Sequence, residues 1–404
     1  MEIQPILAAM RRNKIGASII VVQTAITYAI LCISISIIQQ RLSLSDRPSG
    51  TQERDIFEIA NQWVGQPSDL SARAQADLAA LRALPGVIDA YASNSYPLSN
   101  GGWDDGVSLE PTDSHWITQS ALYFSDEHGL NTLGLKLVAG RNFESSEIVE
   151  RGDLDRKPPG CVIVTQALAA KLFPNGEALG KSIYLVSHRA KATIVGIVEQ
   201  LQEPWVSGRN RDSANSMLQP YRYVERFSHY LVRVQPGQLN AVMKATQNTL
   251  MALNRGRIIE RTRSLPESRR IAYRDDRALA IILSIVSVVM LAVTACGIVG
   301  ITSFWVAQRR RQIGIRRAMG ATRSAIVRYF QTENLMIAVA GAVLGWALAV
   351  TLNIWMVSRF EMARLGAAYT LSASGIVLVL GQIAVLWPAL RAAAISPVVA
   401  IRDN

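Results

Sequence analysis

Four stretches of this sequence contain no Asp, Glu, Lys or Arg over a length that can cross a lipid bilayer. They are residues 15–38, 278–306, 335–357 and 371–390. About 20 consecutive apolar residues, wound as a helix, cross the roughly 30 Å of hydrocarbon in a membrane. The sequence therefore predicts four transmembrane helices, with one large segment between the first and the second.

The charged residues are unevenly divided between the membrane part and this large segment. Residues 39–276 contain 27 Lys and Arg and 27 Asp and Glu, so the net charge of +11 belongs to the remainder of the chain. Cations that flank membrane spans meet anionic lipid head groups. The distribution therefore predicts contact with membrane lipid, and it argues against nucleic-acid binding.

The connection between the second and third spans is strongly basic. It contains Arg309, Arg310, Arg311, Arg316, Arg317 and Arg323, whereas the connection at 358–370 holds only Arg359, Glu361 and Arg364 as charged residues. Short loops rich in arginine stay in the cytoplasm. We therefore expect both termini in the cytoplasm and residues 39–276 outside it. Arg11, Arg12 and Lys14 precede the first span, which is too long for a signal peptide and is expected to be an uncleaved anchor.

These considerations divide the chain into nine parts. In order, they are a cytoplasmic amphipathic helix (1–14), a first span (15–38), an extracytoplasmic domain (39–276), a second span (277–306), a cytoplasmic loop (307–332), a third span (333–357), a short outer loop (358–370), a fourth span (371–390) and a cytoplasmic tail (391–404).

The extracytoplasmic segment shows both helical and strand-like periodicity. Helices are predicted at 54–64, 71–84, 167–173 and 239–254, and strands at 87–92, 161–165, 182–186, 193–198, 230–234 and 256–264. Cys161 is the only thiol in this segment, so its fold does not depend on an internal disulfide. We predict an α-helical membrane protein with four transmembrane helices plus an α+β extracytoplasmic domain of two subdomains, inserted between helices 1 and 2.

A search for catalytic chemistry is negative. Residues 174–182 resemble a phosphate loop, but only three residues separate Gly176 from Gly180, so a turn is predicted. The histidines, His115, His128, His188 and His229, lack the spacing of a zinc site. The predicted spans contain no charged residue deep in the bilayer, which argues against ion-coupled transport. We therefore predict no catalytic, cofactor-binding or metal-binding residue.

The basic loop can form a short amphipathic helix. Ile313, Ile315 and Met319 lie among its arginines, and Gly314 and Gly320 let the chain turn into and out of it. Two interpretations remain open. The loop is either an anchor that acts only through its positive charge, or a docking surface for a partner. In the spans, Gly341 and Gly345 form a G-x-x-x-G pattern. Together with Gly297 and Gly300, these glycines are candidates for close packing between helices. The alternative is that the pattern occurs by chance in a glycine-rich span.

These segments together resemble a known family. Arg309-Arg-Arg-Gln-Ile-Gly-Ile-Arg-Arg-Ala-Met-Gly-Ala-Thr-Arg323, Glu333 at the start of a glycine-rich span, and Ala389-Leu-Arg-Ala-Ala-Ala-Ile-Ser-Pro-Val-Val-Ala-Ile-Arg402 resemble the FtsX-like permease domain, over residues 278–402. Met10-Arg-Arg-Asn-Lys-Ile15 and the segments 137–143, 162–173 and 194–198 are similar to MacB-type permeases and their periplasmic core domain.

The resemblance implies a non-catalytic permease subunit of an ABC transporter in the bacterial inner membrane. Such permeases pair as homo- or heterodimers on a cytoplasmic ABC ATPase, and ATP-driven rocking of the long helices moves the outer domains for substrate efflux or release. The family's docking segment, or coupling helix, maps onto Gln308, Arg309, Arg311, Gln312, Ile313, Gly314, Ile315, Arg316, Arg317, Met319 and Gly320. A periplasmic adaptor and an outer-membrane channel are further partners that the family allows.

The resemblance also has consequences for nucleotide binding. This chain contains no nucleotide loop and starts almost directly with its first span, so ATP and Mg²⁺ are expected on a separate ATPase polypeptide. Gln308 and Gln312 stand where the family often has glutamates, and the effect on coupling is left open. Two alternatives remain: a lipoprotein-releasing or signalling complex, and a passive membrane-anchored binding protein. Replacing Ile313, Ile315 and Met319 by Asp is expected to abolish ATP-dependent function only if the loop docks.

Overall fold

The computed structural model describes residues 14–111, 116–151, 157–187, 190–206, 214–360 and 365–395. The chain divides into two compact units, which we call the helical unit (residues 1–44 and 275–404) and the mixed unit (residues 45–274). The predicted cytoplasmic helix at 1–14 lies outside the described residues except for Lys14. The predicted tail is described only as far as Ile395.

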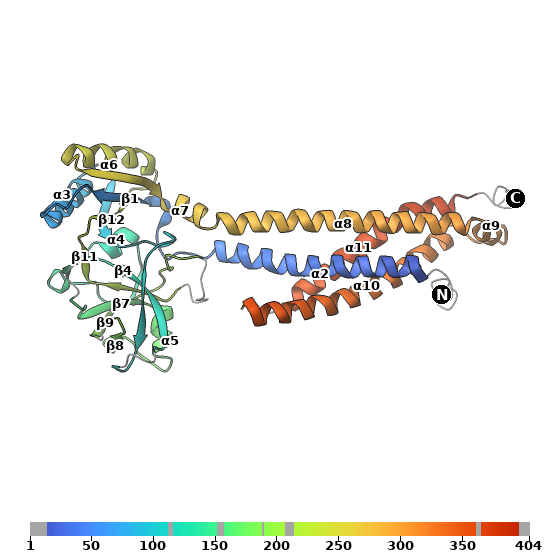
Figure 1. Ribbon diagram of the computed structural model, residues 1–404, viewed down its shortest axis with the longest axis horizontal. Helices are drawn as coiled ribbons and strands as arrows, with labels where there is room; N and C mark the ends of the chain where they lie inside the picture. The colour runs from blue at the N-terminus through green and yellow to red at the C-terminus, as the bar shows by residue number, and fades with distance from the viewer. Residues whose placement is uncertain are drawn as a thin grey trace. The chain divides into compact units, whose positions relative to one another are not determined.

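The helical unit is built from helices that coincide with the four apolar runs (Figure 1). Each helix is long and apolar enough to cross a membrane, and each extends beyond its uncharged run. A shorter helix, α9, connects the second and third of them. Their bounds are α2 (Lys14–Ser45), α8 (Arg274–Gln308), α9 (Arg310–Ala318), α10 (Arg323–Phe360) and α11 (Ala367–Ala393).

Helix α2 is the most enclosed helix of this unit. Half of its most apolar stretch is buried, compared with 17% for α8. Thr27 of α2 shares a hydrogen bond of 2.8 Å with Thr294 of α8, and the Tyr28 hydroxyl donates to the Thr370 carbonyl of α11 at 2.9 Å. In a bilayer such polar groups need partners within the protein, so these contacts favour one arrangement of the helices.

The mixed unit contains a four-stranded antiparallel sheet in the order β13-β1-β12-β2. Helices α3 and α6 connect β1 to β2 and β12 to β13, which gives the split βαβ order of a ferredoxin-like motif. One face of the sheet packs on these helices through a cluster that includes Phe57, Leu78 and Tyr230. The bounds are β1 (Ile56–Trp63), α3 (Leu70–Arg82), β2 (Val87–Ser93), β12 (Phe227–Val234), α6 (Leu239–Leu253) and β13 (Arg257–Ser264).

A second, seven-stranded sheet is inserted between β2 and β12. Its order is β5-β9-β7-β10-β4-β3-β8, and because β8 also pairs with β9, the sheet closes on itself. Val162, Leu168 and Ile194 belong to its core. The bounds are β3 (Trp103–Ser108), β4 (Thr118–Phe124), β5 (Leu137–Gly140), β7 (Cys161–Thr165), α5 (Gln166–Leu172), β8 (Ser182–Leu185), β9 (Ala190–Val198) and β10 (Ser216–Gln219).

Shorter elements complete the mixed unit. β6 and β11 form a two-stranded parallel pair. The bounds are η1 (Glu53–Asp55), α4 (Gly129–Leu133), η2 (Ser145–Glu147), β6 (Val149–Arg151), β11 (Tyr221–Tyr223) and α7 (Leu265–Ala272).

The helix predicted at 54–64 is wrong. The chain forms one short turn, η1, and then the strand β1, which pairs with β12 and β13 on its two sides. Nearly every residue of β1 is buried because both faces of the central strand are covered. A strand buried on both faces does not alternate, so its apolar residues also fit helical spacing. The other predicted helices and strands of this segment are confirmed, with ends that differ by a few residues.

Candidate functional site

The basic loop between α8 and α10 folds around the short helix α9. Helix α8 ends at Gln308 and α9 begins at Arg310, so Arg309 alone connects the two helices. At the other end Gly320 has a φ of +97°, a left-handed conformation that glycine adopts without steric cost. The Thr322 hydroxyl then accepts the Ala325 amide at 3.2 Å and caps the start of α10. These features hold α9 as a distinct element between two long spans (Figure 1).

One face of α9 is buried against the helical unit. Ile313 is 6% exposed, and Gly314 is also buried. Ile313 belongs to an apolar cluster that joins α8, α10 and α11, and this cluster includes Trp305, Ile326, Phe330, Ala389 and Ala392. The inner face of α9 is therefore part of the core of this unit.

The opposite face of α9 is exposed. Met319 is 75% exposed and Ile315 is 43% exposed, and Arg311 and Gln312 are exposed beside them. These four residues recur at intervals of one, three and four, so they form one stripe on a helical surface. We call Arg311, Gln312, Ile315 and Met319 the outer face of α9. It combines apolar contact area with a cation and an amide.

An ion pair fastens the start of α9 to α10. Nη1 of Arg309 lies 3.1 Å from Oε1 and 3.0 Å from Oε2 of Glu333, whose side chain is 2% exposed. The Arg309 guanidinium also lies 5.8 Å from the ring centroid of Trp305, the last-turn aromatic of α8. A buried carboxylate is stable only when it is paired, so Arg309 satisfies Glu333 and holds three elements together.

Further contacts tie the same end of the unit to α10 and α11. The Arg316 guanidinium lies 5.3 Å from the ring centroid of Tyr329. Arg317 donates to the Ile395 carbonyl oxygen at 2.5 Å, just beyond α11. Asn334 donates to the Gly381 carbonyl oxygen at 2.9 Å and is itself buried. Arginines of the loop are thus used within this chain as well as on its surface.

The residues predicted to dock a partner therefore differ in their position. Gln308, Arg311, Gln312, Ile315, Arg316, Met319 and Gly320 are exposed, Arg309 and Arg317 are half-buried, and Ile313 and Gly314 are buried. Docking by this segment stays a prediction. The structure narrows the surface that a partner can reach to the exposed set, and Ile313→Asp would damage the core rather than a docking contact.

The glycines predicted to pack helices lie in the spans. A Cβ added to Gly341 would lie 2.7 Å from the Thr24 Cβ atom, and one added to Gly345 would lie 2.7 Å from the Ala25 carbonyl oxygen, both on α2. A Cβ on Gly297 would lie 2.5 Å from Oε1 of Gln23, whereas Gly300 has no neighbour within 4 Å. At Gly341 and Gly345 the backbone approaches α2 too closely for a side chain, whereas at Gly297 the close atoms belong to the end of the Gln23 side chain.

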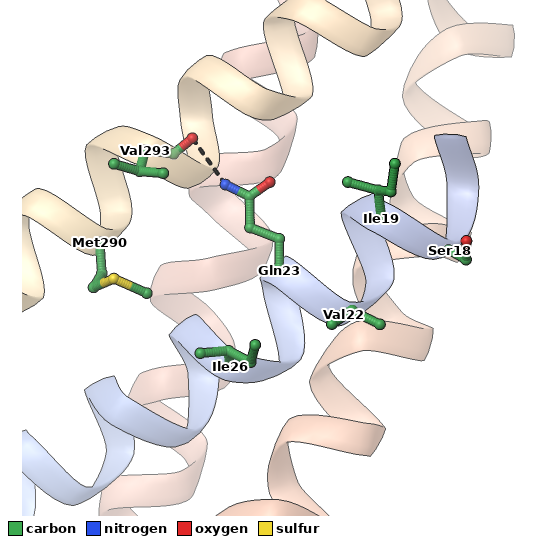
Figure 2. A pocket seen from close by; sticks show the side chains of 7 residues that line it. All are labelled: Ser18, Ile19, Val22, Gln23, Ile26, Met290 and Val293. Carbon is green, nitrogen blue, oxygen red and sulfur yellow. Dashed lines mark hydrogen bonds between the residues drawn. The ribbon is translucent and has the colours of Figure 1, made fainter. Parts of the chain in front are cut away.

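Gln23 spans a groove between α2 and α8 (Figure 2). Its amide nitrogen donates to the Val293 carbonyl oxygen at 2.9 Å. The groove has a volume of about 520 Å³, and apart from Gln23 and Ser18 its lining is apolar: Ile19, Val22, Ile26, Met290 and Val293. It opens to the outside of the helical unit and offers no catalytic group.

The mixed unit contains ionisable groups that are used structurally. His229 lies 2.7 Å from buried Glu58, and His128 lies 2.9 Å from Asp89. His115 and His188 are outside the described residues. Within the described part of the chain, no group of three His, Cys, Asp or Glu side chains is placed to hold a metal ion. Residues 174–181 form turns, as predicted, and β8 begins at Ser182.

Arg141, Glu147 and Cys161 form a small cluster of this kind. Arg141 donates to both Glu147 oxygens at 2.7 and 2.8 Å, which lowers the pKa of Glu147 to about 2. Burial, with the nearby Glu147 carboxylate, raises the pKa of the Cys161 thiol to about 11. A buried thiol with a raised pKa carries little thiolate at neutral pH and is therefore a poor nucleophile.

The residues that bind the loop to the spans include Glu333 and Asn334, and no motif marks either of them. From the sequence, Glu333 is expected only as the start of a span. A signal is nevertheless present, since an acid and an amide directly before an uncharged run require partners in a bilayer. Their partners, Arg309 and the Gly381 carbonyl oxygen, are distant in sequence and follow only from the packing.

Two family models match the chain. One, described as FtsX-like permease C-terminal, matches residues 284–397. The other, described as MacB-like periplasmic core domain, matches residues 24–249, which is more than half of the chain.

Curated relatives are similar at a lower level. The macrolide export ATP-binding/permease protein MacB of Chromobacterium violaceum is 27% identical over 54% of this chain and 32% of its own length. MacB 1 of Yersinia pestis bv. Antiqua is 25% identical over 97% of this chain and 59% of its own length. A probable syringafactin export ATP-binding/permease protein, SyfD of Pseudomonas syringae pv. tomato, is 24% identical over 90% and 52%. The chain thus spans about a third to three fifths of these relatives.

Two solved structures also align. The periplasmic region of MacB from Actinobacillus actinomycetemcomitans has 13% identity and a TM-score of 0.35, covering 57% of this chain and 97% of that chain. The extracellular domain of the transporter YknZ from Gram-positive bacteria has 16% identity and a TM-score of 0.31, covering 50% and 100%.

The MacB-like model covers part of the first span and the mixed unit as far as residue 249, and the FtsX-like model covers most of the later spans. The chain belongs to the MacB/FtsX-like family of ABC transporter permeases, with a MacB-like periplasmic core domain between its first span and the others.

Proposed function

We propose that this chain is the permease subunit of an ABC transporter and transmits ATP-driven motion from a cytoplasmic ATPase to the mixed unit, for substrate efflux or release. The relatives that support this are described as export ATP-binding/permease proteins. We also propose that ATP and Mg²⁺ bind to this ATPase and not to the 404 residues of this sequence, which contain no G-x-x-x-x-G-K-[S/T] sequence.

The observation that carries the proposal is the two-sided construction of α9. Its inner face is buried through Ile313, and its ends are tied to α10 and α11 through Arg309 and Arg317. On its outer face, Ile315 and Met319 are exposed at the surface of the helical unit. A helix that is exposed on one side and fastened to two spans on the other can pass displacement from a bound partner into those spans.

The chemistry of the outer face suggests what the partner presents. Exposed Ile315 and Met319 fit a shallow apolar groove, and methionine adapts to irregular surfaces. Arg311 and the arginines beside it favour an acidic rim, which would also speed association. Gln312 in place of an acid removes a negative charge from this surface, so a partner with fewer basic residues is expected.

We place the chain in the bacterial inner membrane with both termini in the cytoplasm. The placement rests on the positive-inside rule, because the arginine-rich loop joins the second and third spans. The mixed unit then lies in the periplasm. This arrangement puts the outer face of α9 on the side where ATP is available.

We assign the exposed side of α8 to a second permease subunit. Only 17% of its most apolar stretch is buried in this chain, and the groove around Gln23 lies along the same helix (Figure 2). Small and polar residues in an apolar surface promote association of membrane helices. The second subunit can be a further copy of this chain or a homologue.

The test is extraction of the tagged full chain from its own membranes in mild detergent, with mass spectrometry of co-purifying proteins and an ATPase assay. A P-loop ATPase in stoichiometric amount and vanadate-sensitive turnover are expected. Met319→Asp should release the ATPase, Met319→Leu should retain it, and both variants should keep the wild-type melting temperature.

Other outcomes would point elsewhere. Recovery without any ATPase, from membranes shown to contain one, would contradict the permease function and favour a passive binding protein. Co-purification of lipoproteins would identify the releasing complex instead of an exporter. If Met319→Asp retained the ATPase, docking would have to be moved to another part of the loop.

A further inference from the structure

A groove lies between the first turns of α10 and the last turns of α11. Its volume is about 390 Å³, within the range of about 300–1,000 Å³ that is typical of small-ligand sites. Val327, Leu390, Ala393 and Ala394 form an apolar lining, and Arg323, Ser324 and Arg328 add polar groups from α10. The groove therefore combines an apolar floor with two cations.

Neither arginine has an anionic partner in the described part of the chain. Arg323 and Arg328 are exposed, and no carboxylate of the described residues forms a salt bridge with either. Outside residues 39–276 the sequence contains only four acids, Glu2, Glu333, Glu361 and Asp403. Of these, Glu333 is the one within the described residues, and it is occupied by Arg309. Among the described residues, no carboxylate supplies a counter-anion for the groove.

The groove lies at the depth of the membrane boundary. Leu390 is the last residue of the fourth uncharged run, and Arg328 precedes the third by seven residues, about 10 Å along a helix. The Arg391 guanidinium stacks over Trp387 at 4.2 Å, and such aromatic residues are typical of the interface between hydrocarbon and head groups. In a bilayer we therefore expect Leu390 and Val327 to contact acyl chains and the two arginines to lie among the head-group phosphates.

We propose that this groove binds an anionic phospholipid, with the head-group phosphate between Arg323 and Arg328 and one acyl chain along Val327 and Leu390. Basic pockets between membrane helices bind such head groups because the guanidinium pairs with phosphate oxygens at the edge of the hydrocarbon. A lipid bound here contacts α10 and α11 together and stabilises the pair at the end where α9 joins them.

A membrane lipid fits the groove better than the partner ATPase does. The lining residues do not include the outer face of α9, and Leu390 is 54% exposed on the side of the spans. A soluble protein that docked on the arginines would leave the apolar lining of the groove uncovered. A phospholipid covers the apolar lining with an acyl chain and pairs its phosphate with the arginines. The proposal requires only that the spans lie in a membrane, so it does not depend on the proposed ATPase.

The test is native mass spectrometry of the delipidated full chain, titrated with phosphatidylglycerol or with phosphatidylcholine of the same acyl chains. Arg323→Gln and Arg328→Gln should each lower the affinity for phosphatidylglycerol about fivefold, the effect expected for one cation near an anionic surface. The double lysine variant should keep the preference. Arg359→Gln, at the other end of α10, should have no effect and serves as the charge-matched control.

Three results would overturn the proposal. They are unchanged affinity in the double glutamine variant, an equal loss in Arg359→Gln, and equal binding of the two lipids by the wild type. Co-purification of the partner ATPase is measured on the same variants. Loss of the ATPase with unchanged lipid affinity would assign Arg323 and Arg328 to a protein interface instead, whereas loss of lipid with the ATPase retained would support the lipid site.

Discussion

Glu333 accepts both of its charged hydrogen bonds from one nitrogen of Arg309, at 3.0 and 3.1 Å, and Arg309 is the residue between α8 and α9. One ion pair thus joins the end of one span, the start of the loop helix and the first turns of the next span. The Glu333 side chain is 2% exposed and that of Arg309 is 13% exposed, so water and salt screen this pair only weakly.

Glu333→Gln tests whether this ion pair carries motion. We expect the ATPase to remain bound, because the outer face of α9 is untouched, while ATP-dependent movement of the mixed unit falls about tenfold, a typical size for coupling between two sites. The movement can be measured by spin-label distances within the purified complex, with and without ATP.

Two further variants check this interpretation. Exchanging the charges in Arg309→Glu/Glu333→Arg should restore part of the movement, because the pair is rebuilt in reverse. Arg359→Gln removes an arginine of the same helix and should behave as the wild type. Full movement in Glu333→Gln would show that the apolar cluster alone transmits the displacement.

Ile313→Asp and Met319→Asp should separate stability from docking. A carboxylate at Ile313, which is 6% exposed, is expected to lower the free energy of unfolding by several kcal/mol, on the order of 3–5, as for an unpaired buried charge. At Met319, 75% exposed, the same change should leave the melting temperature unchanged. Thermal unfolding in detergent distinguishes them, and equal destabilisation would contradict the two-sided arrangement of α9.

Gly345→Ala and Gly300→Ala form a matched pair within the spans. A Cβ at Gly345 would lie 2.7 Å from the Ala25 carbonyl oxygen, so overpacking should lower the free energy of unfolding by about 1–3 kcal/mol. Gly300 has no neighbour within 4 Å, and its replacement should be neutral or slightly stabilising in this chain. Loss of dimer in Gly300→Ala, with stability unchanged, would locate a contact to the second subunit.

Asp77→Asn should destabilise the four-stranded sheet of the mixed unit. Arg257 donates to both Asp77 oxygens at 2.5 and 2.7 Å, and the two side chains are 1% and 2% exposed. Removing one partner leaves a buried charge, which costs about 3–5 kcal/mol. Chemical denaturation followed by tryptophan fluorescence reports this loss, because Arg257 stacks over Trp63 at 4.2 Å. An unchanged midpoint would show that solvent reaches the pair.

The turn at Glu147 should loosen in acid. The pKa of Glu147 is lowered from its usual 4.5 to about 2 by Arg141, so the folded state favours the ionised carboxylate. Its stabilisation is complete above about pH 5 and is lost as pH falls towards 2. Hydrogen exchange of residues 144–148 should accelerate over this range, and Glu147→Gln should exchange fast at every pH. A flat profile in the wild type would rule out this role.

The sequence predicts the spans well because each is an uncharged run of membrane length, and it predicts most strands of the mixed unit from their β-branched residues. It fails at β1, where burial on both faces removes the alternation that marks a strand. The insertion of one sheet between β2 and β12 also cannot be seen in the sequence, because strand order depends on pairing between distant segments.

For the loop, amphipathicity predicts a short helix but not which residues face outwards. Ile313 and Ile315 are both apolar and two positions apart, which places them on different faces of a helix. Only the packing of Ile313 among Phe330 and Ala389 decides which of them is buried. In the same way, the six arginines of the loop look alike in sequence, although Arg309 pairs with buried Glu333 and Arg311 is exposed on the outer face of α9.

The ion pair between Arg309 and Glu333 also sets the smallest piece of this permease that can be transplanted. A graft of residues 309–318 alone would separate Arg309 from Glu333 and from the ring of Trp305 beside it. Grafting residues 305–334 keeps the stacked ring, the ion pair and Asn334 in one continuous segment. Partner specificity in such hybrids should therefore follow this thirty-residue cassette, counted from 305 to 334, and not the loop helix alone.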